Sequence, residues 1–163
     1  MNIQKPIVAL FDFDGVVMDT ESQYTIHWNK QAEKYGLGIV DFGRVIKGQT
    51  LTQIFENYFS DVPELHEQIT AELIAFQQSM HFEYIAGVKE FMQQLRACGV
   101  KMAIVTSSDL DKMNIVYREH PELPLMVDEI LTAERFTQSK PHPECFLLGA
   151  SVFNAPIENC VVF

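Results

Sequence analysis

A chain of 163 residues with a net charge of −10 has room for one domain or for one domain with an inserted module, and its acidic balance argues against nonspecific nucleic-acid binding. Apolar residues make up 47% and charged residues 21%, as in soluble globular proteins, and the N-terminus shows no apolar run long enough for a signal peptide or membrane span. The three cysteines are scattered and lack metal-ligand spacing, which is typical of reduced thiols, so we expect a cytoplasmic protein. We also expect a monomer with no membrane or nucleic-acid partner.

The first predicted element is a buried strand over residues 7–11, which leads directly into Asp12 and Asp14. Parallel sheets have such unbroken apolar strands and place their chemistry beyond the carboxyl ends. Two aspartates this close repel each other, so a proton, a basic side chain or a divalent metal must neutralise them. A calcium loop also begins D-x-D, but it requires Gly and Glu where this chain has Val17 and Tyr24. The simplest alternative is a strand end with two solvated aspartates.

The stretch over residues 18–84 is predicted to be a small helical module without strands. Apolar side chains recur there at helical spacing in three stripes, which we interpret as the core of the module rather than as ligand contacts. The stripes are Tyr24, Trp28, Ala32 and Tyr35, then Leu51, Ile54, Phe55, Tyr58 and Phe59, then Leu65, Ile69, Leu73, Phe76 and Met80.

The remaining residues alternate between helical and strand patterns. Strands are predicted over 102–105, 129–131 and 161–163, with a helix before each, and Ser108 is predicted to cap the second of these helices. A helical insertion followed by β-α-β-α-β predicts an α/β fold with a Rossmann-like parallel sheet. Residues 1–17 and 85–163 would form this core, and residues 18–84 would interrupt it.

The stretch F-D-F-D-G-V-V-M-D-T-E resembles the first motif of the haloacid dehalogenase-like (HAD) hydrolase superfamily. The family pattern, D-x-D-G-x-x-x-D-[ST], is matched by Asp12, Asp14, Gly15, Asp19 and Thr20. The similarity is greatest to the branch of small-cap sugar-phosphate phosphatases and beta-phosphoglucomutases. The resemblance implies that Asp12 is a nucleophile that takes the phosphoryl group, that Asp14 is general acid and base, and that residues 18–84 form a helical cap. It also implies Mg²⁺, bound by the Asp12 carboxylate and the Asp14 backbone carbonyl.

Two later positions extend the resemblance. Thr106 ends a predicted strand in G-V-K-M-A-I-V-T-S-S, where its hydroxyl and nearby backbone N–H groups, Ser107 among them, suit a phosphoryl oxygen. The alternative for Thr106 is a helix N-cap. Lys140, in S-K-P-H-P-E-C-F, offers an ammonium beside Asp12, and the family lysine at this position binds the phosphoryl group. Backbone N–H groups around Gly15 are expected to contact the same oxygens.

The segment K-G-Q-T-L resembles a cap loop in which beta-phosphoglucomutases carry an arginine that binds the far phosphate of the substrate. Leu51 stands at the arginine position, and Tyr24 stands where the mutases have a histidine. Both departures favour a phosphatase over a mutase. Lys47 and Gln49 are candidates for substrate contact, and an ordinary loop is the alternative.

The chain resembles about the first three-quarters of a family member. It reaches Phe163 where the family places an acidic pair that completes the Mg²⁺ site, so we expect a truncated chain that lacks the C-terminal part of the core. The expected function is Mg²⁺-dependent hydrolysis of a small phosphorylated metabolite, a sugar phosphate, through an aspartyl phosphate. The alternatives are a beta-phosphoglucomutase-like phosphomutase and an inactive truncated binding protein.

Overall fold

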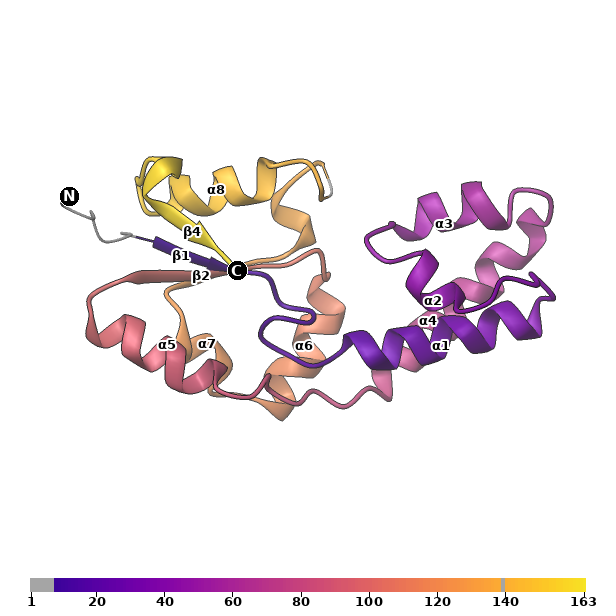
Figure 1. The fold of residues 1–163 in the computed structure, drawn as a ribbon, viewed down its shortest axis with the longest axis horizontal. Coiled ribbons are helices and arrows are strands. Elements are labelled where there is room, and N and C mark those ends of the chain that lie inside the picture. The colour runs from indigo at the N-terminus through magenta and orange to yellow at the C-terminus, as the bar shows by residue number, and fades with distance from the viewer. Residues whose placement is uncertain (1–7, 139) are drawn as a thin grey trace. The chain divides into compact units, whose positions relative to one another are not determined.

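The chain forms two compact units in the computed structural model, which describes residues 8–138 and 140–163. Residues Met1–Asp19 and Phe82–Phe163 make up the first unit, and Thr20–His81 make up the second (Figure 1). The second unit corresponds to the predicted module of residues 18–84, with bounds that are two to three residues shorter at each end. The role of this module as a cap stays a prediction. Ile7, which belonged to the first predicted strand, lies outside the described residues.

A parallel sheet of four strands lies at the centre of the first unit, with the strand order β3-β2-β1-β4. Its strands are β1 (Val8–Phe11), β2 (Lys101–Val105), β3 (Glu129–Leu131) and β4 (Cys160–Val162). Leu10 of β1 pairs with Ala103 of β2 on one side and with Val162 of β4 on the other. Because β1 lies between two neighbours and is covered on both faces, all four of its residues are buried. The predicted α/β fold with a Rossmann-like parallel sheet is confirmed.

Helices cover both faces of this sheet, with α8 on one face and α5 on the other (Figure 1). The helical elements of the first unit are α5 (Val88–Ala97), α6 (Leu110–Glu119), α7 (Leu123–Met126), η2 (Ala133–Arg135), α8 (Glu144–Val152) and η3 (Ile157–Asn159). Gly149 lets α8 approach β1 closely, because a Cβ atom there would lie 2.9 Å from Cδ2 of Leu10. Neither the short helix α7 nor the two 3-10 turns was predicted from the sequence.

The second unit is entirely helical, as the sequence pattern predicts. Its elements are α1 (Glu21–Lys34), α2 (Phe42–Val45), α3 (Leu51–Tyr58), η1 (Pro63–Leu65) and α4 (His66–Gln78). Members of all three apolar stripes, among them Trp28, Ile54 and Ile69, share one buried cluster with Phe42 from α2. The prediction that the stripes form the core of the module is therefore confirmed, and the prediction that they make no ligand contacts stays untested. Helix α2 was not predicted, since four residues are too few to show a helical period.

The two segments that connect the units pair with each other inside the first unit. The Asp19 amide donates to the carbonyl of Glu83 at 2.8 Å, and the Ile85 amide donates to the carbonyl of Val17 at 3.0 Å. These two hydrogen bonds fix both connecting segments within the first unit, up to Asp19 on one segment and from Glu83 on the other.

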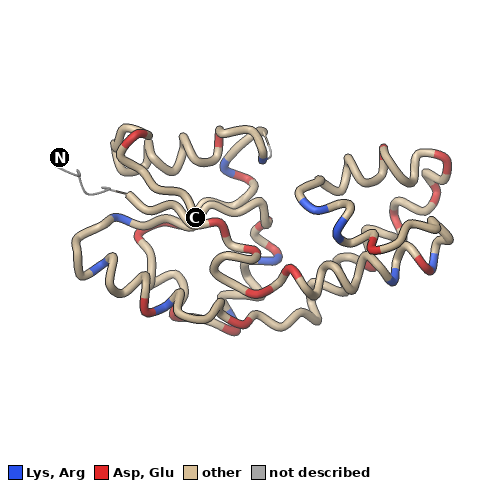
Figure 2. The backbone as a smooth tube through the Cα atoms, viewed as in Figure 1, with Lys and Arg blue, Asp and Glu red and all other residues tan. Residues whose placement is uncertain are grey.

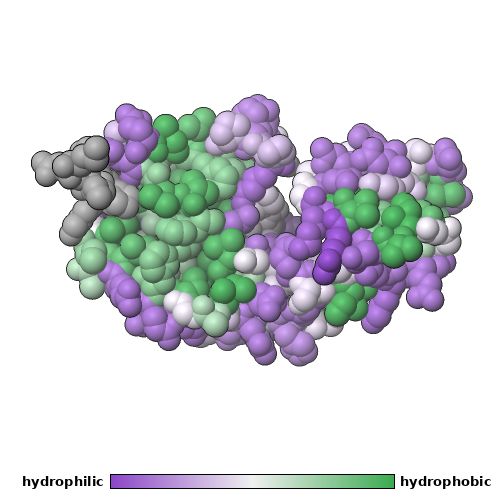
Figure 3. All heavy atoms as spheres, in the orientation of Figure 1, coloured by the Kyte–Doolittle hydropathy of each residue, from purple (hydrophilic) through white to green (hydrophobic). Residues whose placement is uncertain are grey.

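Asp and Glu residues occur along the backbone of both units, in keeping with the net charge (Figure 2). Apolar side chains also reach the surface on the face of the first unit that carries β4 (Figure 3). There Val161, Val162 and Phe163 are 39%, 46% and 41% exposed. Val161 and Val162 belong to the edge strand β4, and Phe163 follows it directly. Within the described part of the chain, no helix is long and apolar enough to cross a membrane.

Candidate active site

Asp12 is the first residue after β1, and its carboxylate is held by two donors. Its Oδ1 atom accepts a hydrogen bond from the Phe13 amide at 2.7 Å and lies 2.7 Å from Nζ of Lys140. The same Nζ donates to the carbonyl of Val105, the last residue of β2, at 3.0 Å. Lys140 thus reaches the carboxyl ends of both β1 and β2. The structure brings together the aspartate and the lysine that the sequence places 128 positions apart.

Asp14 has a different set of partners. Nζ of Lys112 lies 2.6 Å from Oδ1 and 2.8 Å from Oδ2, and the Ser108 hydroxyl donates to Oδ2 at 3.0 Å. Each of the two aspartates is therefore paired with its own lysine. A basic side chain is one of the three ways of neutralising this pair that the sequence allowed.

The prediction that Ser108 caps a helix is wrong. Helix α6 begins at Leu110, and Asp109 is the N-cap, because its side chain accepts a hydrogen bond from the Lys112 amide at 2.9 Å. Asp109 has the extended backbone that an N-cap requires and is as good a capping residue as serine. Ser108 is thereby left to bind Asp14.

Lys112 is a site residue that sequence reasoning missed. A single lysine on a helix normally faces solvent, yet only 3% of this side chain is exposed. One signal could have revealed it. Lys112 lies in the first turn of α6, where the helix dipole disfavours a cation, so a lysine there suggests a carboxylate partner elsewhere in the fold.

Thr106 follows β2 directly and is fully buried. Its amide donates to the carbonyl of Leu131 at 2.9 Å, and its Oγ1 atom accepts from the Ser108 amide at 3.0 Å. The hydroxyl can still donate its own proton, as binding of a phosphoryl oxygen would require. Ser107, the other candidate in this segment, is exposed.

Gly15 shapes the loop after β1 through its backbone. Its φ angle is +75°, a conformation that favours glycine, and its amide donates to the carbonyl of Met18 at 2.8 Å. This N–H group is thus already used inside the loop. The expectation that it contacts a phosphoryl oxygen finds no support in this geometry.

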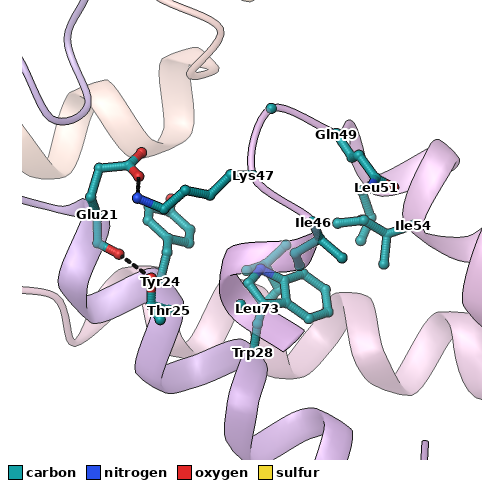
Figure 4. Close-up of a pocket in the computed structure, with 12 residues that line it drawn as sticks. Glu21, Tyr24, Thr25, Trp28, Ile46, Lys47, Gln49, Leu51, Ile54 and Leu73 are labelled. Atoms are coloured by element: carbon teal, nitrogen blue, oxygen red, sulfur yellow. Dashed lines mark hydrogen bonds and ion pairs between the residues drawn. The ribbon is translucent and has the colours of Figure 1, made fainter. Parts of the chain in front are cut away.

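A pocket of about 200 Å³ lies in the second unit, and both Lys47 and Gln49 line it (Figure 4). Its apolar floor includes Trp28, and Glu21 stands at its polar rim. Nζ of Lys47 lies 2.6 Å from Oε2 of Glu21. The Gln49 side chain accepts from Asn57 at 3.2 Å. The two candidate residues therefore share a pocket, and each has a partner within the unit.

A family model described as haloacid dehalogenase-like hydrolase matches residues 9–162. The chain belongs to this family.

Relatives of this haloacid dehalogenase-like hydrolase include two phosphatases. Hexitol phosphatase A from Escherichia coli (strain K12) is 27% identical over 157 residues, which cover 94% of this chain and 71% of that protein. The phosphorylated carbohydrates phosphatase from Thermotoga maritima is 26% identical over 169 residues, covering 95% and 74%. The structure of beta-phosphoglucomutase from Clostridium difficile matches with a TM-score of 0.72 at 22% identity, over 96% of this chain and 74% of that one, which shows a common fold.

The Mg²⁺ expected from the family has a small set of ligands here. Among residues 8–138 and 140–163, no group of three or more His, Cys, Asp or Glu side chains is placed to hold a metal ion. Both carboxylate oxygens of Asp14 accept from Lys112, so Asp14 is left with its backbone carbonyl. The residues present fit a Mg²⁺ bound through the single carboxylate of Asp12, since this ion often keeps several waters and takes further oxygens from a substrate phosphate.

Proposed function

We propose that this hydrolase is a phosphatase that cleaves the phosphate ester of a small phosphorylated metabolite, a sugar phosphate. One observation carries the proposal: the Asp12 carboxylate stands at the carboxyl end of β1 with Nζ of Lys140 2.7 Å away, next to the strand end that carries the buried Thr106. A carboxylate nucleophile beside a fixed cation and a hydroxyl suits attack on a phosphoryl group. The relatives named as hexitol and carbohydrate phosphatases support the substrate class.

The first chemical step transfers the phosphoryl group to the protein. The Asp12 carboxylate attacks phosphorus in line, the bond from phosphorus to the ester oxygen breaks, and an aspartyl phosphate forms. Asp14 gives the departing oxygen the proton that it took from water in the preceding cycle, and this oxygen leaves as an alcohol. Lys140 and Thr106 stabilise the charge on the remaining phosphoryl oxygens.

The second step regenerates the enzyme. Asp14 takes a proton from a water molecule, and this water attacks the phosphorus of the aspartyl phosphate. The bond between phosphorus and the Asp12 oxygen breaks, which releases inorganic phosphate and returns the Asp12 carboxylate. One cycle therefore consumes one phosphate ester and one water molecule and releases one alcohol and one inorganic phosphate.

Mg²⁺ is the cofactor that we propose, bound by the Asp12 carboxylate and the Asp14 backbone carbonyl. When bound, it supplies positive charge that offsets the charge of the phosphoryl oxygens. In the second unit, which we propose to be the specificity cap, Lys47 and Gln49 would contact the sugar. Their pocket combines an apolar floor with a charged rim, and a sugar phosphate has both apolar and polar surface. Ser107 would contribute its backbone N–H to the phosphoryl oxygens.

The proposal is tested by measuring inorganic phosphate released from hexitol phosphates, hexose phosphates and p-nitrophenyl phosphate, each with and without Mg²⁺. We expect release that depends on Mg²⁺ and that falls by about 1000-fold or more in Asp12→Asn, with unchanged circular dichroism. Asp61→Asn, an exposed aspartate in the second unit, is the matched control and should keep full activity. Isomerisation of a sugar phosphate without net phosphate release would indicate a mutase, and wild-type rates in Asp12→Asn would exclude Asp12 as the nucleophile.

A further inference from the structure

The charged end of Lys112 lies inside the protein and contacts both oxygens of one carboxylate. Only 3% of the Lys112 side chain is exposed, and Nζ is 2.6 Å and 2.8 Å from the two oxygens of Asp14. Its Nζ also lies 5.6 Å from the centre of the Phe13 ring. Lysine is almost never fully buried unless it is paired, so the position of this side chain depends on Asp14. An ammonium that contacts both oxygens also restricts the rotation of that carboxylate.

Other lysines in the same unit form a different kind of ion pair. Lys89 pairs with Glu122 at 3.1 Å and Lys101 with Asp128 at 2.7 Å, and their side chains are 41% and 57% exposed. Exposed pairs of this kind are screened by water and add little to stability. The pair formed by Lys112 is largely removed from water, which gives it a fixed geometry.

Helix formation does not account for a lysine at this position. Lys112 lies in the first turn of α6, where the helix dipole favours acidic side chains. The Asp109 cap, which accepts from the Lys112 amide at 2.9 Å, fixes this turn and thereby the place from which the lysine side chain extends. The unfavourable end of the helix dipole is offset by the contacts with Asp14.

Ser108 supplies a second contact from the same segment. Its hydroxyl donates to Oδ2 of Asp14 at 3.0 Å, while its amide donates to Oγ1 of Thr106 at 3.0 Å. The seven residues from Thr106 to Lys112 thus hold the candidate acid and base and also carry the candidate phosphoryl-binding hydroxyl.

We propose that Lys112 is a positioning residue that, together with Ser108, holds the Asp14 carboxylate in the orientation needed for proton transfer. The proposal rests on the proposed function, because it assigns to Asp14 the proton transfers of that reaction. A general acid must lie within hydrogen-bond reach of the oxygen it protonates, and a carboxylate that rotates freely loses this alignment. Lys112 acts through Asp14 and does not touch the reacting atoms.

The test compares two substrates that differ in their need for an acid. An alkyl phosphate such as sorbitol 6-phosphate expels an alkoxide and requires a proton, whereas p-nitrophenyl phosphate expels a stable phenolate and does not. In Lys112→Met, which keeps the length of the side chain, we expect kcat/KM to fall about 100-fold for the alkyl phosphate and less than about threefold for the aryl phosphate. Lys101→Met is the matched control and should leave both values unchanged.

A second variant keeps the test informative if Lys112→Met does not fold. Ser108→Ala removes one contact to Asp14 without removing a charge, and it should shift the ratio of the two kcat/KM values in the same direction by about tenfold. An equal loss for both substrates in either variant would indicate a merely structural role and would overturn the proposal. Unchanged kcat/KM for the alkyl phosphate would overturn it as well.

Crystal structures of the wild type and of the Lys112→Met chain separate this proposal from the phosphatase assignment. We expect the Asp14 carboxylate to rotate away or to occupy more than one conformer in the variant. An Asp14 side chain that keeps its orientation would overturn the positioning role, whatever the chain hydrolyses. If the wild type released no phosphate from either substrate, the proposed function would fail. The role of Lys112 in that reaction would then fail as well, even if the Asp14 side chain were displaced in the variant.

Discussion

Lys140 binds Asp12 and the end of the neighbouring strand at the same time. Its Nζ atom is 2.7 Å from Oδ1 of Asp12 and donates to the carbonyl of Val105 at 3.0 Å. The Lys140 ammonium also lies 5.1 Å from the centre of the Phe146 ring in α8. The cation is therefore held in place before any substrate arrives, which is the condition under which a charge stabilises a transition state efficiently.

Replacing Lys140 by Met should lower kcat about 100-fold, because the phosphoryl oxygens lose a preorganised cation. The measurement is phosphate release at saturating sugar phosphate, with thermal unfolding as a check on the fold. Lys89→Met removes a lysine of a more exposed ion pair in the same unit and should retain activity. A Lys140→Met chain with the turnover of the wild type would show that this cation does not act on the phosphoryl group.

Replacing Thr106 by Val should lower both activity and stability. The change removes the candidate phosphoryl donor, and it leaves the Ser108 amide without the acceptor it has at 3.0 Å. We expect kcat/KM to fall about tenfold and the free energy of unfolding to fall by about 1–2 kcal/mol. Thr106→Ser keeps the hydroxyl and should preserve most of the activity. Equal activity in the Val and Ser variants would mean that the hydroxyl contacts no phosphoryl oxygen.

The second unit should become less stable as the pH falls below about 6.5, because of His27. This side chain is buried, stacks on Phe76, and has an Nε2 atom without a hydrogen-bond partner among the described residues. Burial lowers the pKa of His27 below 6.5, with a smaller opposing effect from Glu72 and a further lowering by Lys30. The unfolded chain then binds more protons than the folded chain, so the stabilisation present above pH 6.5 is lost progressively on acidification.

His27→Phe should weaken this pH dependence, since phenylalanine keeps a ring on Phe76 and binds no proton. The measurement is urea unfolding at about pH 7.5 and about pH 5.5, followed by the fluorescence of Trp28, the single tryptophan, which lies in the second unit. His81→Gln changes an exposed histidine in the same unit and should leave the pH dependence as it is. If His27→Phe kept the full difference between the two pH values, another group would be responsible.

Gly43→Ala should destabilise the second unit through a direct clash. A Cβ atom at Gly43 would lie 2.5 Å from the carbonyl oxygen and 2.6 Å from Cα of Thr25, and neither backbone atom can move without separating α2 from α1. We expect a loss of about 2–3 kcal/mol in urea unfolding. Gly48→Ala is the comparison, because open space surrounds Gly48 and only its φ of +80° opposes a side chain. That strain costs about 1 kcal/mol, and a Gly43→Ala loss no larger than this would contradict the close approach.

Much of the fold was predictable because it follows from local patterns. The unbroken apolar run before Asp12 predicts a buried central strand, and β1 is fully buried. The stripes through Trp28 and Ile69 predict helices with a common core, which the second unit shows. Short elements such as α2 escaped prediction because four residues carry too little periodicity.

The choice between neighbouring residues of similar chemistry was harder. Ser108 and Asp109 are both good N-caps, and the sequence favours neither strongly. In the structure Asp109 caps α6 while Ser108 binds Asp14, a residue 94 positions away. The decision depends on where α6 lies against the loop after β1, and no local pattern encodes that.

The residues alone predict that two aspartates follow a buried strand and that a helical module interrupts an α/β sheet, and the resemblance to the family motifs implies that Lys140 lies beside Asp12. These features rest on apolar periodicity and on short motifs, which are local. The pairing of Asp14 with Lys112 is visible only in the folded chain, because no motif marks Lys112 and 98 positions separate the two residues. Their contact arises from the parallel pairing of β1 with β2 and from the helix that follows β2, and such long-range contacts are fixed by packing rather than by the pattern of neighbouring residues.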